Sequence, residues 1–285
     1  MRITTLVLIA LLLIPVVASA QVEFQCDPSE NYYTAGELSV AIEDFSQAIL
    51  EYSCAIQLGD NPPSAHFFRA RVYARMDELQ AAFDDLTRAI GLEPRFARAY
   101  YVRGLLLRRT GNAEAAIADF TSALTINPQY VQAYNSRAVT HFRLGNYAQT
   151  IADYSQLIEV APEYITAFNN RGYTYNVLGE LELAVADFSR AIELKPDETT
   201  LYVNRGRVFA AQNNFEAAVA DFNRAINLDA GNSLAYLHLG FAYDSLGIPP
   251  QALANFQRYV ELAAEDADPA VLDRIRQLQQ IIAGQ

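Results

Sequence analysis

The sequence contains few residues of the kinds that hold metals or form disulfide networks: two cysteines and three histidines among 285 residues. A structural metal site or a disulfide-rich scaffold needs more of these ligands. Basic residues are also scarce, because 21 Lys and Arg stand against 33 Asp and Glu, and Lys195 is the only lysine. A net charge of −12 excludes the basic surface of a general nucleic-acid binder. Apolar residues nevertheless make up 52%, which excludes intrinsic disorder.

Motifs for catalysis and for cofactor binding are missing as well. No glycine-rich phosphate loop, Gly-x-Ser-x-Gly or His-Glu-x-x-His occurs. The three histidines lack metal-ligand spacing, and we interpret His66 and His141 as core histidines with satisfied hydrogen bonds. Acidic residues recur periodically, whereas catalysis usually needs one unrepeated constellation. We therefore expect a non-enzymatic protein with no cofactor and no metal.

Long apolar runs are absent except at the N-terminus. Arg2 precedes an apolar run over residues 3–17, and Ala18-Ser19-Ala20 supplies a small-x-small cleavage pattern. Residues 1–20 therefore predict an export signal, with an uncleaved membrane anchor as the alternative. The run is short for a transmembrane helix. We expect an exported protein (periplasmic, cell-envelope or extracellular) with no membrane span after cleavage before Gln21.

The two cysteines gain meaning from this compartment. An exported protein with only Cys26 and Cys54 is most simply interpreted as having one disulfide, which would tie residues 21–31 to the first helix. The alternative is one buried and one exposed thiol. No Cys-x-x-Cys pair occurs, so we expect a structural role and no redox role.

A period of 34 residues organises most of the chain. It carries Pro94, Pro128, Pro162 and Pro196, five arginines from Arg69 to Arg205, and five aspartates from Asp85 to Asp221. Such a period indicates a repeat array rather than one closed core. Within a unit, helical apolar spacing occurs twice, with a break such as Gly111-Asn112 between the two segments. Each unit therefore predicts two helices that bury their second face only on a neighbouring unit.

These units resemble the tetratricopeptide repeat. A small residue in the first helix, an Ala-x3-aromatic-x2-Ala pattern in the second and a terminal proline recur, as in Gly104, Ala116, Phe120, Ala123 and Pro128. The resemblance implies an all-α, right-handed superhelical solenoid of helix-turn-helix repeats. Its six units are 63–96, 97–130, 131–164, 165–198, 199–232 and 233–264.

The two ends of the array are less regular. Residues 21–62 contain a degenerate first repeat that acts as an N-terminal cap, and two registers remain open for it. Either Ala41-x3-Phe45-x2-Ala48 or Ala48-x3-Tyr52-x2-Ala55 is the second-helix pattern. Residues 265–285 predict a capping helix. Its inward stripe would be Leu272, Ile275, Leu278 and Ile281, with Arg274 and Gln277 turned outward.

The periodic arginines and aspartates allow two interpretations. They could form a basic ladder for an anionic ligand, or Arg–Asp pairs between neighbouring helices. Equal numbers and a matched period favour the structural pairs.

The resemblance places a ligand groove on the concave face, at recurrent positions of the first helices. Mapped onto this chain, these positions are Phe67, Arg71, Arg75, Arg98, Tyr101, Arg108, Arg109, Asn135, Arg143, Asn170, Tyr173, Asn204 and Arg207. Residues 60–146 carry 11 basic and 8 acidic groups, against 9 and 18 in residues 147–285. Arginine beside aromatic rings suits an acidic protein or peptide. Ordinary helix-face arginine is the alternative, and an asparagine ladder from Asn170 to Asn204 is a further hypothesis.

Three functions remain open at this point. The first is an exported scaffold that holds a peptide or partner helix in the concave groove. The second is an envelope assembly or tethering factor that uses the convex or acidic C-terminal surface, and the third is a regulatory subunit of an envelope enzyme. The sequence identifies neither the partner nor the oligomeric state.

Overall fold

The computed structural model describes residues 26–284, so the export-signal prediction for residues 1–20 lies outside the described residues. These residues form helices with no strand among them. The helices are α1 (Tyr32–Ala41), α2 (Phe45–Leu58), α3 (Pro62–Arg75), α4 (Leu79–Leu92), α5 (Ala97–Arg109), α6 (Ala113–Ile126), α7 (Val131–Arg143), α8 (Tyr147–Val160), α9 (Ile165–Leu178), α10 (Leu181–Leu194), α11 (Thr199–Ala211), α12 (Phe215–Leu228), α13 (Ser233–Ser245), α14 (Pro249–Ala263), the short 3₁₀ turn η1 (Ala264–Asp266) and α15 (Pro269–Ala283).

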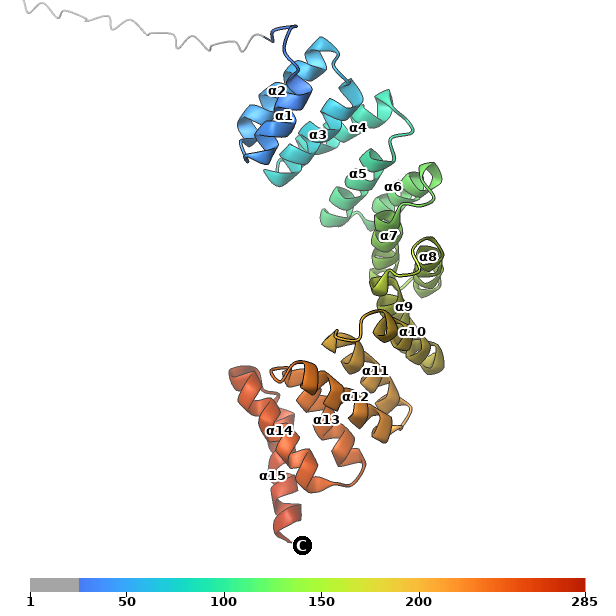
Figure 1. Ribbon diagram of the computed structural model, residues 1–285, viewed down its shortest axis with the longest axis vertical. Helices are drawn as coiled ribbons and strands as arrows, with labels where there is room; N and C mark the ends of the chain where they lie inside the picture. Colours follow the sequence, from blue (N-terminus) through green and yellow to red (C-terminus); the bar gives the residue numbers. More distant parts are fainter. Residues whose placement is uncertain (1–25, 285) are drawn as a thin grey trace, which may run out of the picture.

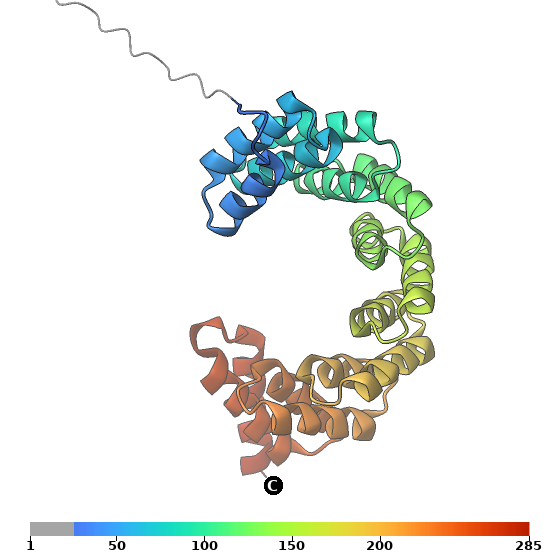
Figure 2. The ribbon, with the colours of Figure 1, turned by 45° about the horizontal axis from the view of Figure 1, so that its top comes forward.

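Consecutive helices pack in pairs, from α1 with α2 to α13 with α14, and each pair packs on the next. The pairs form an open crescent (Figure 2). In the middle of the arc, α5, α7 and α9 lie on the inner side, and α6, α8 and α10 lie outside (Figure 1). The predicted all-α solenoid of helix pairs is confirmed.

The small residue of each first helix lets the two helices of a pair approach closely. In α11, a Cβ added at Gly206 would lie 2.7 Å from a ring carbon of Phe222 on α12. Phe222 is 1% exposed, between the fully buried Ala218 and Ala225 one turn on either side. The small-to-large match of these positions therefore sets the spacing within the pair.

The N-terminal pair continues the same period in the second of the two registers. Ala48, Tyr52 and Ala55 are fully buried, whereas Ala41 is exposed. Asp44 instead caps α2, because its carboxylate accepts a 3.0 Å hydrogen bond from the backbone N–H of Gln47. The helix ends at Gly59, which has a φ of 79°. A disulfide joins Cys26 to Cys54 with their Cα atoms 5.4 Å apart, so the predicted structural bond is confirmed.

At the C-terminal end, α15 covers α14 with a face that agrees only in part with the predicted stripe. Leu278 is buried and Ile275 packs beside it, as predicted, but Leu272 and Ile281 are 40% and 42% exposed and Val271 is buried instead. Arg274 does not point away from the solenoid, because its guanidinium binds the carboxylate of Asp244 on α13 at 2.7 and 2.8 Å. The prediction that Arg274 is turned outward is therefore wrong, because its guanidinium joins α15 to α13.

Candidate functional site on the inner face

The periodic arginines are occupied within the solenoid. Each uses Nε and Nη2 on the carboxylate of the aspartate sixteen residues later, as Arg171 does on Asp187 at 2.8 Å. The other pairs are Arg69–Asp85, Arg103–Asp119, Arg137–Asp153 and Arg205–Asp221. The five aspartates are 5–6% exposed. The structural interpretation of the Arg/Asp series is therefore confirmed, and these residues are not free for a ligand.

Each of these five periodic arginines also makes a third contact, which the sequence analysis missed. Its Nη1 donates to a hydroxyl of the preceding pair, as Arg171 does to Ser155 at 2.8 Å. The other acceptors are Ser53, Thr87, Thr121 and Ser189. The 34-residue recurrence of Ser or Thr was the available signal. Each arginine thus links two repeats as well as two helices of one repeat.

Three hollows occupy equivalent places between successive first helices. The N-terminal hollow lies among α1, α2 and α3, the central one among α7, α8 and α9, and the C-terminal one among α11, α12 and α13. A buried aromatic residue of the second helix lines each: Tyr52, Tyr154 and Phe222, which are related by whole numbers of repeats. The repeat therefore builds the same concavity several times along the inner face.

The chemistry of the hollows differs because the variable positions differ. Around Tyr52 stand Phe68, Arg71 and Arg75, with a volume of about 280 Å³. The central hollow is lined by Phe142, Arg143, Asn170 and Tyr173 and has the same volume. The C-terminal hollow, of about 240 Å³, is lined by Arg207, His238 and Phe241. All three combine aromatic walls with an arginine, and all are of side-chain rather than cofactor size.

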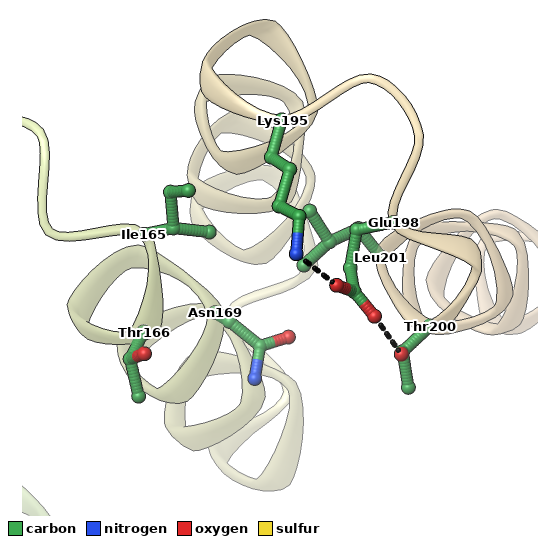
Figure 3. Close-up of a pocket in the computed structure, with 7 residues that line it drawn as sticks. All are labelled: Ile165, Thr166, Asn169, Lys195, Glu198, Thr200 and Leu201. Carbon is green, nitrogen blue, oxygen red and sulfur yellow. Dashed lines mark hydrogen bonds and ion pairs between the residues drawn. The ribbon is translucent and has the colours of Figure 1, made fainter.

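A fourth hollow of about 280 Å³ lies beside them, at the starts of α9 and α11 and the turn that follows α10 (Figure 3). Glu198 accepts hydrogen bonds from Lys195 at 2.7 Å and from Thr200 at 2.8 Å. The only lysine of the chain is thereby neutralised at this polar opening.

The predicted groove arginines divide into paired and unpaired groups. Arg75 contacts Glu43 at 3.0 Å and Arg109 contacts Asp77 at 3.2 Å, so these two carry a carboxylate partner already. Within residues 26–284, no carboxylate lies within ion-pair distance of the remaining groove arginines, which are Arg71, Arg98, Arg108, Arg143 and Arg207. This second group is the charge available to a partner.

Phe67 does not face a ligand, because it is 3% exposed and packs at 5.0 Å from Phe96. It instead supports Arg71 and Arg98, whose guanidinium carbons lie 5.8 and 5.5 Å from its ring centroid. The expectation of a direct contact from Phe67 is therefore wrong. The groove position is an aromatic platform beneath two unpaired cations.

The asparagines of the predicted groove form hydrogen bonds with one another, which the sequence does not indicate. Asn204 donates to Asn169 at 3.0 Å, Asn169 to Asn170 at 3.0 Å, and Asn170 to the hydroxyl of Tyr154 at 3.1 Å. Asn170 and Asn204 are thus linked through Asn169, and part of their hydrogen-bonding capacity is used internally.

The remaining predicted residues are placed as follows. Tyr101 packs against Tyr130 at 5.0 Å, and the side-chain oxygen of Asn135 is buried with no hydrogen-bond partner. Tyr173 is 41% exposed with its ring 5.6 Å from Phe142. Tyr173 thus presents an accessible aromatic surface on the inner face.

The three histidines occupy three environments. His66 Nδ1 lies 2.7 Å from Asp85, and although burial raises the pKa of that carboxyl, hydrogen bonds from Arg69 and His66 outweigh it and hold the pKa low. His141 Nδ1 is buried without a partner, so the satisfied-core interpretation fits only His66. Burial, with a smaller contribution from Arg207, lowers the pKa of His238 to about 4. His238 stacks on Phe222 in the C-terminal hollow, a groove residue that the sequence analysis missed although its repeat position matches Asn170 and Asn204.

Over residues 26–284, the side chains of His, Cys, Asp and Glu form no group of three that could hold a metal ion. In the same part of the chain, no helix has the length and apolarity needed to cross a membrane.

Structure comparison finds the same architecture in solved proteins. The C-terminal part of a TPR repeat-containing protein from Cytophaga hutchinsonii shares 18% identity and a TM-score of 0.73, over 85% of this chain and 98% of that one. A tetratricopeptide repeat protein from Parabacteroides merdae gives 17% identity and 0.59, over 88% and 99%. YrrB, a TPR protein with an unusual peptide-binding site, gives 20% and 0.58, over 67% and 97%.

Sequence comparison points to the same class. No curated protein sequence matches the chain. Family models do match: a TPR repeat model at residues 206–247, and tetratricopeptide repeat models at 69–131, 131–164 and 165–198. These repeats and the helix-pair solenoid support a protein–protein interaction scaffold, and the chain belongs to the tetratricopeptide repeat family.

Proposed function

We propose that this protein is an exported, non-catalytic scaffold that binds an extended, acidic segment of a partner protein along the inner face. The observation that carries the proposal is the recurrence of one hollow between successive first helices, each lined by aromatic residues and an arginine. An extended peptide presents side chains at regular intervals, which suits a surface with regularly spaced concavities.

The unpaired arginines supply the charge preference. Arg71 and Arg98 are exposed on the Phe67 platform, and Arg108 follows on the same inner face of α5. All three fall in the one stretch, residues 60–146, where basic groups outnumber acidic ones. Arginine pairs with carboxylates through two parallel hydrogen bonds, which favours Asp and Glu side chains of the partner. The likeness to YrrB, which has a peptide-binding site, supports the class of ligand.

The disulfide supports the exported location, because such bonds persist mainly outside the reducing cytoplasm. Two measurements test this location directly. Cell fractionation should find the protein outside the cytoplasm with Gln21 as its first residue, and thiol titration of the denatured protein should find no free cysteine. A cytoplasmic protein that begins at Met1 with two free thiols would contradict export.

A cross-linked pull-down tests the groove. Residues 21–285 and a triple Arg71→Glu, Arg98→Glu, Arg108→Glu variant are used as baits against extract of the source organism, with bound proteins identified by mass spectrometry. We expect the variant to lose a specific partner while its circular dichroism stays unchanged. The matched control reverses Arg88, Arg95 and Arg224, three exposed arginines of the second helices and their following turn.

The control should retain the partner. If the control loses it and the groove variant keeps it, binding uses the convex surface, as expected for an assembly or tethering factor. If both variants retain every captured protein, the groove assignment is wrong.

A further inference from the structure

The hydroxyl of Tyr52 is buried and has no hydrogen-bond partner. Tyr52 is 0% exposed, and its oxygen is one of only three buried side-chain polar atoms without a partner in residues 26–284. The equivalent residue three repeats later is Tyr154, whose hydroxyl accepts a 3.1 Å hydrogen bond from Asn170. Next to Tyr52, Phe68 on α3 stands in place of Asn170 and stacks on Tyr52 with ring centroids 6.1 Å apart. The partner of this hydroxyl is therefore missing from the protein itself.

Tyr52 lines the N-terminal hollow. Glu37 and Val40 line it from α1, and Phe68, Arg71, Val72 and Arg75 line it from α3. Burial, followed by the negative charge of Glu37, raises the pKa of Tyr52 above its ordinary value. The hydroxyl therefore keeps its proton and can donate a hydrogen bond. The hollow thus offers an apolar wall, an aromatic wall and an unused hydroxyl on a buried side chain.

The charged groups at the rim balance one another. Arg75 is held by Glu43 at 3.0 Å, which leaves Glu37 and Arg71 without an ion-pair partner among the described residues. The site therefore combines one free acceptor, one free cationic donor and the Tyr52 hydroxyl. Inside this hollow an anion would meet Glu37 and a cation would meet Arg71, so neither charge is favoured here, and the preference for carboxylates rests on Arg98 and Arg108 outside it. A neutral group with both a donor and an acceptor satisfies all three.

We propose that the N-terminal hollow binds a primary carboxamide, the side chain of a glutamine or asparagine in the partner segment. The carbonyl oxygen accepts from Tyr52 and Arg71, and the amide NH₂ donates to Glu37. This inference rests on the proposed function, because it assigns one anchor of the segment that the inner face binds. The volume of about 280 Å³ accommodates one side chain and its methylene stem.

NMR titration of residues 21–285 with capped amino acids tests the assignment. The probes are the N-acetyl, N-methylamide derivatives of glutamine, glutamate, lysine and norleucine, together with free glutamine. We expect capped glutamine to shift the backbone amide signals of Gly36 and Val72, with an affinity about tenfold higher than that of the other capped probes. Free glutamine should bind more weakly than capped glutamine, because its charged amino and carboxylate groups lose hydration when it enters the hollow.

Two variants locate the recognition. Tyr52→Phe and Glu37→Ala should each reduce capped-glutamine affinity to the level of norleucine, while Tyr154→Phe, the matched change in the central hollow, should leave it unchanged. A fold check by circular dichroism accompanies each variant. The inference is overturned if glutamate or norleucine binds as tightly as glutamine, if no probe binds, or if Tyr52→Phe binds glutamine as well as the unaltered protein does.

This result separates from that of the arginine reversal. If no glutamine preference is found but reversal of Arg71, Arg98 and Arg108 still abolishes partner capture, only the carboxamide assignment fails. If Arg98→Glu and Arg108→Glu leave both capture and glutamine binding intact, the hollow is a carboxamide site, and Arg98 and Arg108 do not bind the partner.

Discussion

Asn170 donates its side-chain amide to the hydroxyl of Tyr154 across 3.1 Å. Sixteen residues separate the two, the same interval that joins each periodic arginine to its aspartate. One spacing therefore supports two kinds of contact, from Asn170 to the preceding helix pair and from Arg171 to Asp187 within its own pair. Burial raises the pKa of Tyr154 to about 12, although the hydrogen bond from Asn170 acts in the other direction. The phenol therefore remains protonated at all physiological pH values.

Removal of the two equivalent hydroxyls should have opposite effects on stability. Tyr154→Phe breaks a buried hydrogen bond and leaves Asn170 with an unmet donor, so it should lower the free energy of unfolding by about 1 kcal/mol. Tyr52→Phe removes an unpaired buried hydroxyl and should raise that free energy by about 1 kcal/mol. Chemical denaturation of both variants makes the comparison. A loss of stability in Tyr52→Phe would mean that the hydroxyl has a partner, such as an internal water.

The periodic Arg–Asp pairs should contribute to stability, because their aspartates are buried and need a counter-ion. Arg171→Met leaves Asp187, which is 6% exposed, without its cation and should lower the free energy of unfolding by about 3 kcal/mol. The double variant Arg171→Met, Asp187→Leu should recover most of the loss, because an apolar pair does not need a counter-ion. Arg190→Ala breaks an exposed pair with Glu193 and should cost under about 1 kcal/mol. Equal losses at Arg171 and Arg190 would contradict the role of burial.

Two glycines in open space should respond in opposite ways to alanine. Gly179 follows α9 with a φ of 79°, and Gly91 lies within α4, and a Cβ at either meets no atom within 4 Å. Gly179→Ala forces an L-residue into the left-handed region and should destabilise by about 1 kcal/mol. Gly91→Ala removes backbone freedom from the unfolded chain and should stabilise by about 0.5–1 kcal/mol. Thermal unfolding measures both, and changes of the same sign would show that contacts rather than φ decide.

His238 should make the solenoid less stable in mild acid. Its folded-state pKa is about 4, below the ordinary value of 6.5, so between these values the unfolded chain binds a proton that the folded chain excludes. The contribution of His238 is thus unchanged above about pH 6.5, falls as the pH drops toward about 4 and levels off below. The difference in unfolding midpoint between about pH 7.5 and pH 5 should shrink in His238→Phe. An unchanged difference would show that other groups control the acid response.

The sequence by itself determined the repeat. A 34-residue period in small, aromatic and proline residues depends only on spacing along the chain, and each helix pair can bury its second face only on the next. The Arg/Asp pairs were predictable because the arginines and the aspartates recur with the same period. The Cys26–Cys54 bond was predictable because the chain has only two cysteines.

The tertiary structure decided which side chains remain free. Arg75 and Arg109 look like Arg71 and Arg98 in the sequence, yet only the first two reach Glu43 and Asp77 in the turns of the preceding pairs. Likewise, Phe68 in place of Asn170 leaves the Tyr52 hydroxyl without a partner, and Arg274 binds Asp244 on α13 rather than facing outward. These outcomes depend on differences of about one or two ångströms in the distances between side chains on neighbouring helices, and apolar periodicity does not encode such differences. Periodicity fixes which faces meet, and side-chain geometry at the interface fixes what is left to bind a partner.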